Sequence, residues 1–179
     1  METYTIANIA RVDIVTEETT PKTYTLEEVA SQAEASAFVS EGQSEELRVK
    51  NTIHAQIVTE DITKGYQIKL NNVRAVLEVL ALVDGGNWDD TAKKYTGPAA
   101  GEVTERIPFT LKIYTEDLDY NGDVLNYIMF EYKHCKGKPV NFIQNDGEFA
   151  TQELNLVARP KKGEPVTSFD VLSELPESA

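Results

Sequence analysis

Alternation of apolar and polar residues runs through most of the chain. Between residues 7 and 16, β-branched apolar side chains stand among polar ones, which predicts a strand ended by a turn at 17–21. Residues 24–28 fit a second short strand or a first turn of helix. At 33–38, alanines alternate with other residues, and this period predicts a strand despite alanine's helix propensity because Gly42 follows soon after.

A polar stretch at 41–51 interrupts this pattern. It has little to bury, so an exposed loop or a protruding hairpin arm is expected, reaching over about 41–52. Beyond it, residues 53–57 and 66–70 each alternate and are separated by Thr63-Lys64-Gly65, which predicts a hairpin with one wet face. The charged residues expected on the arm are Glu45, Glu46, Arg48 and Lys50.

One segment has helical periodicity, at residues 73–83. Its apolar stripe is Val73, Val76, Leu77 and Leu80. Asn71 or Asn72 is expected to cap the first turn, and Asp84-Gly85-Gly86 to end the helix. Residues 87–102 lack periodicity and are expected to form an irregular surface connection.

Three further strands are expected, at 106–114, 124–133 and 151–159. The dipeptide Asn121-Gly122 favours a tight hairpin turn between the first two. The second of them is apolar on both faces, which predicts a strand covered on both sides. The proline-containing tail at 160–179 is expected to be an extended or loosely held segment.

Length and charge narrow the class of protein. A chain of 179 residues, 41% hydrophobic and 26% charged, fits one folded domain. Its net charge of −13 repels nucleic acid and anionic membranes. The single cysteine, Cys135, excludes an intrachain disulfide and indicates folding in a reducing cytoplasm. No export signal or membrane span is visible in the sequence.

Two groups of residues raise the question of metal binding or catalysis. Asp117, Asp119, Asn121 and Gly122 repeat the first half of an EF-hand loop, but Ile128 stands where a bidentate Glu is needed, so an acidic hairpin turn is favoured. His54 and His134 lack a second ligand at metal spacing, and His134-Cys135 are neighbours on a strand, whose side chains point to opposite faces. We therefore expect no enzyme activity, no metal and no cofactor.

The order of segments resembles the tail tube (major tail) proteins of long-tailed bacteriophages and related contractile injection systems. The residues that carry the resemblance lie between about 7 and 165: Ile57-Val58-Thr59-Glu60-Asp61, Gly65-Tyr66-Gln67-Ile68, Glu78-Val79-Leu80-Ala81-Leu82-Val83-Asp84-Gly85-Gly86, Phe109-Thr110-Leu111-Lys112-Ile113-Tyr114, Cys135-Lys136-Gly137-Lys138-Pro139, Asp146-Gly147-Glu148-Phe149 and Arg159-Pro160.

This resemblance implies a mainly β fold in which two antiparallel sheets pack as a sandwich or small barrel with one flanking helix. It divides the chain into a tail-tube-like domain at 1–165 and an extended C-terminal segment at 166–179. It also implies hexameric rings that stack into a virion tail tube, an arm that reaches the next ring, and contacts with tape measure and tail terminator or baseplate proteins. DNA would pass through without specific binding, and assembly would take place in the host cytoplasm.

Acidic side chains are the candidates for the wall of such a channel, because a repulsive wall lets DNA slide. The loops that concentrate acids contain Asp84, Asp89, Asp90, Asp117, Asp119 and Asp123. Two other classes stay open at this point: a monomeric β-sandwich binding module, and another β-rich virion component such as a capsid decoration or head-completion protein.

Overall fold

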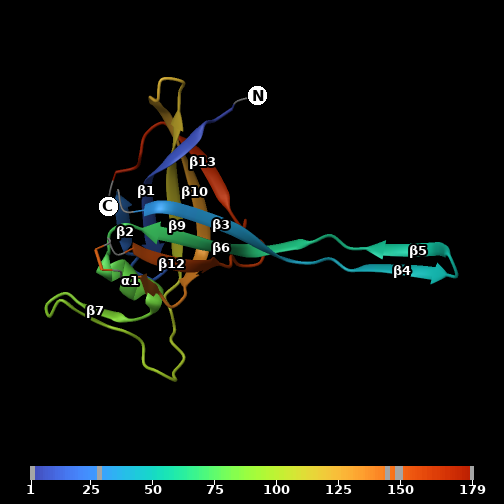
Figure 1. Cartoon of the computed structure of the whole chain (residues 1–179), viewed down its shortest axis with the longest axis horizontal. Helices are drawn as coiled ribbons and strands as arrows, with labels where there is room; N and C mark the ends of the chain where they lie inside the picture. The colour runs from blue at the N-terminus through green and yellow to red at the C-terminus, as the bar shows by residue number, and fades with distance from the viewer. Residues whose placement is uncertain (1–2, 28–29, 144–145, 148–150, 178–179) are drawn as a thin grey trace.

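The computed structural model describes residues 3–27, 30–143, 146–147 and 151–177. Strands dominate the described chain: β1 (Ile6–Thr16), β2 (Thr23–Glu27), β3 (Ala30–Ser40), β4 (Ser44–Val49), β5 (Thr52–Val58), β6 (Ile62–Asn72), β7 (Asn87–Asp89), β8 (Lys94–Thr96), β9 (Phe109–Leu118), β10 (Val124–Gly137), β11 (Asn141–Ile143), β12 (Thr151–Ala158) and β13 (Ser168–Leu172). One helix, α1 (Leu77–Asp84), lies on the flank (Figure 1). Glu28, Glu148 and Phe149, which the sequence assigned to a strand or to the resemblance, lie outside the described residues.

Nine strands form one antiparallel sheet in the order β2-β1-β9-β10-β12-β6-β3, with β11 added beside β12 and β13 beside β10. The sheet bends so that β3 comes close to β1 without pairing with it. The mainly β fold with one helix is therefore confirmed, and its two packed layers are the two halves of a single bent sheet.

The bend lies at β10, where the strand carries one extra residue. Tyr132 pairs with Leu111 and Cys135 with Phe109, so His134 is left over and adopts a left-handed φ of 53°. Its backbone N–H donates to the side-chain oxygen Glu17 Oε1 at 2.9 Å, and not to a backbone carbonyl of a neighbouring strand. A bulge increases local bending and twist, and beyond it β10 leaves β13 and pairs with β12.

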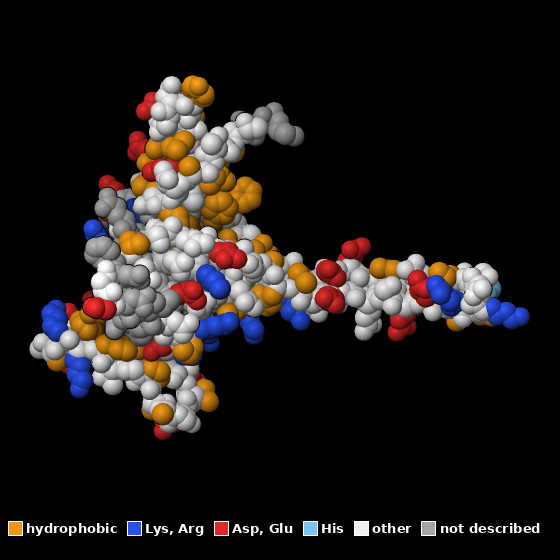
Figure 2. Space-filling view, viewed as in Figure 1, with side chains coloured by type: hydrophobic (Ala, Val, Ile, Leu, Met, Phe, Trp, Pro, Cys, Tyr) orange, Lys and Arg blue, Asp and Glu red, His pale blue; other side chains and the backbone are white. Residues whose placement is uncertain are grey.

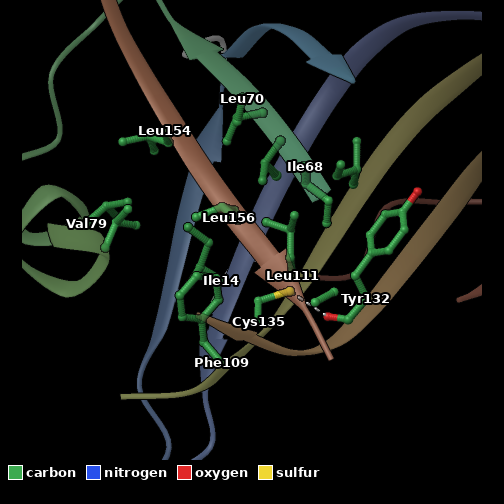
Figure 3. Close-up of a cluster of buried hydrophobic side chains, with 14 of the residues drawn as sticks. Ile14, Ile68, Leu70, Val79, Phe109, Leu111, Tyr132, Cys135, Leu154 and Leu156 are labelled. Carbon is green, nitrogen blue, oxygen red and sulfur yellow. Dashed lines mark hydrogen bonds between the residues drawn. The ribbon is translucent and has the colours of Figure 1, made fainter. Parts of the chain in front are cut away.

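The core fills the space between the two layers (Figure 3). Alternation with period two directs Leu154, Leu156 and Ala158 of β12 inward, and β6 contributes Ile68 and Leu70. From the opposite layer come Val12, Ile14, Phe109, Leu111 and Ile113, all fully or almost fully buried. This burial is the main stabilising contribution to the fold.

The helix closes one end of the core, and here two predicted details are wrong. The helix begins after Val76, which makes no side-chain cap, while Asn71 and Asn72 belong to β6. The predicted stripe is wrong at two of its four positions: Leu80 is buried and Val76 packs against the core, whereas Val73 and Leu77 are exposed. The side chains that α1 buries are Val79, Leu80, Ala81 and Val83, and Gly85 ends the helix in a left-handed conformation as expected.

Three other local predictions also differ from the structure. The predicted hairpin of 53–57 with 66–70 does not exist, because residues 53–57 pair with β4 and residues 66–70 pair with β12 and β3. The connection at 87–102 contains the small hairpin β7–β8. The strand expected to be covered on both sides, β10, is half-buried over much of its length, and its first residues, Val124 and Leu125, are exposed.

The C-terminal segment lies on the body. Residues 168–172 form β13, which pairs with Tyr127–Glu131 of β10. Further on, the carbonyl oxygen of Pro176 accepts a hydrogen bond from the Arg11 guanidinium at 2.7 Å. Arg11 also pairs with Asp13 at 2.8 Å, and the two side chains are almost fully buried on β1. The end of the chain thus covers a buried ion pair.

Candidate assembly surface

The two-stranded sheet β4–β5 projects far from the body as an arm (Figure 1). It continues the line of β3 and β6, and every residue of both strands is exposed. The protruding arm expected from the sequence is present, and its second strand extends it to Val58. The four predicted arm residues, Glu45, Glu46, Arg48 and Lys50, are all exposed on it.

The root of the arm is held by hydrogen bonds between the segment that leads into β4 and the segment that follows β5. The Gly42 N–H donates to Asp61 Oδ1 at 2.7 Å, and the Thr59 N–H donates to the Gln43 carbonyl at 2.9 Å. A Cβ on residue 42 would lie 1.7 Å from the Thr59 carbonyl oxygen, so only glycine allows this approach. These contacts hold the two segments of the arm's root together.

The arm exposes a substantial set of large apolar side chains. They are Leu47, Val49, Ile53, Ile57 and Val58, each between 48% and 64% exposed. Leu47 pairs with Ala55, and Glu45 pairs with Ile57, so these four side chains share one face of the ribbon before the register shifts at His54. The sequence signal for this apolar face is the alternation at 53–57, which predicts a hairpin of these residues with 66–70.

The six candidate channel acids fall into two groups at opposite ends of β10. Asp117, Asp119 and Asp123 lie at the hairpin that precedes β10. Asp84, Asp89 and Asp90 lie beyond its other end, where the Val83 backbone approaches Gly137. A straight strand of 14 residues would span about 46 Å at about 3.3 Å per residue, and the bend in β10 shortens this only in part. The structure therefore separates the two groups within one copy.

Several of these acids have structural partners within the chain. Asp117 is buried and accepts from the Thr5 N–H at 2.6 Å, and Asp84 accepts from Tyr95 Oη and from the Val140 N–H. Burial, reinforced by the Asp84 carboxylate, raises the pKa of Tyr95 to about 12. Asp84 and Asp117 thus have roles inside the fold.

The remaining acids are more available to solvent. Asp89 Oδ1 accepts from the N–H groups of Thr91 and Ala92, and Asp90 forms an exposed pair with Lys93 at 2.7 Å that lowers the pKa of Asp90. Asp119 accepts from backbone N–H groups of the hairpin, while Asp123 is exposed. These are the candidate acids that an assembly could present to a channel.

The turn at Asp119 is the hairpin that the sequence favoured over a calcium loop. Asp119 Oδ1 accepts from the N–H groups of Asn121 at 2.7 Å and Asp123 at 2.8 Å, and Gly122 has a φ of 89°. These backbone hydrogen bonds, the one from Asp123 first, lower the pKa of Asp119. Among the residues with described placement, no cluster of three or more metal-ligating side chains occurs.

The adjacent His134 and Cys135 show no geometry suited to nucleophilic catalysis. Cys135 is fully buried in the core, and burial raises the pKa of its thiol to about 12, so the reactive thiolate is disfavoured. The His134 imidazole pairs through Nδ1 with Glu17, on the face of β10 opposite to the Cys135 side chain. His54, the other histidine, is exposed on the arm.

No family model matches the sequence, and no curated protein matches it in sequence. Solved structures with a similar fold include a chain of an extracellular contractile injection system, the PVC sheath-tube complex in its extended state, with 11% identity, a TM-score of 0.46, and coverage of 92% of this chain and 91% of that one. A chain of the anti-feeding prophage baseplate has 11% identity and a TM-score of 0.46, covering 94% and 97% of the two chains.

A chain of the anti-feeding prophage cap, which terminates the tube, has 12% identity and a TM-score of 0.44, covering 95% of this chain and 93% of that one. The first of these structures is thus a chain of a contractile injection system, and the other two are chains of the anti-feeding prophage. Among the described residues, no helix is long and apolar enough to cross a membrane.

Proposed function

We propose that this chain is a non-enzymatic structural subunit whose copies assemble into rings, hexameric by the family resemblance, that stack into a tail tube. The tube would belong to a phage virion or a phage-derived contractile injection particle. The observation that carries the proposal is the arm, which exposes apolar side chains along a ribbon that makes no contact with its own body beyond the root.

The physics of the arm favours a partner. A two-stranded ribbon is at best marginally stable in water, and exposed apolar surface gains about 25 cal/mol for each Å² removed from water. Leu47 and Ile57 are among the most exposed large apolar residues of the arm. A second copy that covers this face would stabilise both the ribbon and the assembly.

The edges of the bent sheet support lateral joining of copies. β3 is an edge strand of 11 residues, and its sequence contains one charged residue, Glu34, and neither lysine nor proline. Monomeric proteins protect long edge strands with charged side chains, especially lysine, with prolines or with bulges. The register of β3 with β6 is irregular only near the two ends of β3, between Ala30 and Gln32 and between Phe38 and Val39. The regular stretch between them has little protection and favours pairing with a strand of the neighbouring copy within a ring.

The channel of this tube would carry net negative charge, as the net charge of −13 per copy suggests. Of the candidate acids, Asp89, Asp90, Asp119 and Asp123 are the ones free to face it. Duplex DNA would pass without specific binding, and tape measure, terminator and baseplate proteins would be further partners. A density map of the assembled tube tests this, since a wall lined mainly by Lys and Arg would contradict it.

Assembly is tested by negative-stain microscopy and sedimentation velocity over a concentration series. We expect tubes from the wild-type chain, and folded particles that do not polymerise after removal of residues 43–59. Leu47→Ser with Ile57→Ser should also block tubes, whereas Val103→Ser, at an exposed apolar position away from the arm, should not. A wild-type chain that stays monomeric at every concentration would indicate a binding module instead.

A further inference from the structure

A group of basic side chains lies on the outer face of the layer formed by β10, β12, β6 and β3. We call it the basic strip; it consists of Lys69, Lys136, Lys138 and Arg159. The register explains the grouping, because Lys136 pairs with Val157, and Asn155 pairs with Lys69. The neighbouring residues Leu156 and Ala158 face the core, so the strip faces outward.

Two of these cations border a cavity of about 410 Å³. Lys136 and Arg159 line it together with His134, Gly137 and Val157. Lys138 and Lys69 line a neighbouring hollow, which also contains Glu34. Positive charge is thus concentrated around these two hollows, which an acidic side chain of a partner could enter.

The strip has few internal counter-charges. Glu34 lies opposite Lys69 in the register of β3 with β6, and Glu153 lies on the same outer face. Within the part of the chain that the structure describes, the salt bridges involve none of Lys136, Lys138 and Arg159. The Arg159 guanidinium lies 5.4 Å from the centre of the Phe38 ring. These cations are left for a partner in a protein of strongly negative net charge.

The arm has the opposite charge in its root half. Its acids there are Glu41, Glu45, Glu46, Glu60 and Asp61, all exposed, whereas its bases, Arg48 and Lys50, stand near the tip. Of these acids, Glu46 shares an exposed pair with Arg48 at 3.4 Å. Figure 2 shows acidic side chains along the arm and a gathering of Lys and Arg on the body beside the arm's root.

Glu45 and Glu46, in β4, lie away from the basic strip of their own chain, because the arm continues β3 and β6 away from the body (Figure 1). We propose that the acidic root half of the arm docks on the basic strip of a second copy. Each copy then offers one arm and one strip, which makes the contact heterologous. Such a contact extends along an axis when its rotation does not close into a ring. This inference rests on the proposed tube function and identifies the surface that receives the arm.

The experiment reverses charges on each side and then on both. Lys136→Glu with Arg159→Glu should raise the protein concentration needed for tubes at least tenfold, as should Glu45→Lys with Glu46→Lys. Combining the four substitutions should restore assembly, because opposite charges again face each other. Lys93→Glu with Lys94→Glu, in the exposed β7–β8 hairpin, lowers the net charge by the same amount as Lys136→Glu with Arg159→Glu. This control should leave assembly unchanged. Circular dichroism checks that each variant folds.

The outcomes separate the two proposals. If the wild-type chain forms tubes and the strip variant assembles equally well, or if the combined variant fails to recover, the docking inference is wrong while the tube function stands. If the wild-type chain never forms tubes, both are wrong. Binding of duplex DNA provides the remaining outcome. If wild-type tubes retain DNA, and a strip variant that still assembles does not, the strip lies in the channel and the docking inference is wrong.

Discussion

Gly42 is the residue at which the arm's geometry is most sensitive to a single substitution. In Gly42→Ala, the new methyl group would collide with the Thr59 carbonyl, so the two strands of the root must separate and the hydrogen bond to Asp61 weakens. We expect the body to keep its melting temperature within a few degrees, because the arm contributes nothing to the core. Tube formation should fall at least tenfold, which corresponds to about 1.4 kcal/mol per contact.

Gly97→Ala is the matched control for this prediction. A Cβ there would lie 3.7 Å from its nearest neighbour, Tyr95 Oη, which is ordinary contact distance. Assembly of Gly97→Ala should equal that of the wild type. Normal tubes from Gly42→Ala would show that the close approach of the two segments at the arm's root does not control assembly.

Cys135 is expected to be chemically silent in the folded protein. Its side chain is inaccessible, and burial raises the pKa of the thiol to about 12, so thiolate is scarce at neutral pH. Labelling with iodoacetamide, followed by intact-mass measurement, should show no adduct on the native chain and one adduct after unfolding in guanidinium. Rapid labelling of the native chain would contradict the buried position.

At the scale of elements, the β9–β10 hairpin depends on its turn. Asp119→Ala removes the acceptor for the N–H groups of Asn121 and Asp123 and should lower the melting temperature more than Asp119→Asn, which keeps one acceptor oxygen. Thermal unfolding followed by circular dichroism measures both. Calcium should leave the wild-type melting temperature unchanged, and a large calcium-dependent rise that Asp119→Ala abolishes would show a metal site.

The pH dependence of this turn has a definite sign. The pKa of Asp119 is lower in the folded chain than its ordinary value of 3.8, because the Asp123 N–H and its neighbours stabilise the carboxylate. The stabilisation is therefore present above the ordinary pKa and is lost as the pH falls through the lowered one. The stability difference between wild type and Asp119→Asn should shrink on acidification, whereas a difference that grows would refute the assignment.

At the scale of the whole molecule, the C-terminal segment connects to the first strand, because the Pro176 carbonyl accepts a hydrogen bond from Arg11. A chain ending at residue 165 loses β13 and the Pro176 carbonyl, which leaves the buried Arg11 guanidinium without one acceptor. A hydrogen bond to a charged group contributes about 1.5–3 kcal/mol, so the urea midpoint should decrease clearly. Pro176→Ala keeps the backbone carbonyl and should behave like the wild type. A truncated chain of unchanged stability would mean that the segment is only loosely attached.

The sequence could predict elements whose signals are local. Period-two alternation located the strands, and Gly85 and Asn121-Gly122 marked a helix end and a hairpin turn, because left-handed backbone favours glycine wherever it occurs. The polar run at 41–51 located the arm, because a segment whose only apolar residues are Leu47 and Val49 has little to bury in a core. The candidate arm residues Glu45, Glu46, Arg48 and Lys50 followed from that run alone.

Tertiary structure decided which surface each apolar face meets. Residues 53–57 alternate like a core strand, yet they pair with β4 in the arm, since alternation does not distinguish a chain's own core from a partner's surface. The helix illustrates the same limit, because the face that α1 buries is set by where β10 ends beneath it. Likewise, Lys69, Lys136 and Arg159 lie far apart in sequence and share one outer face only because β6, β12 and β10 align in one sheet.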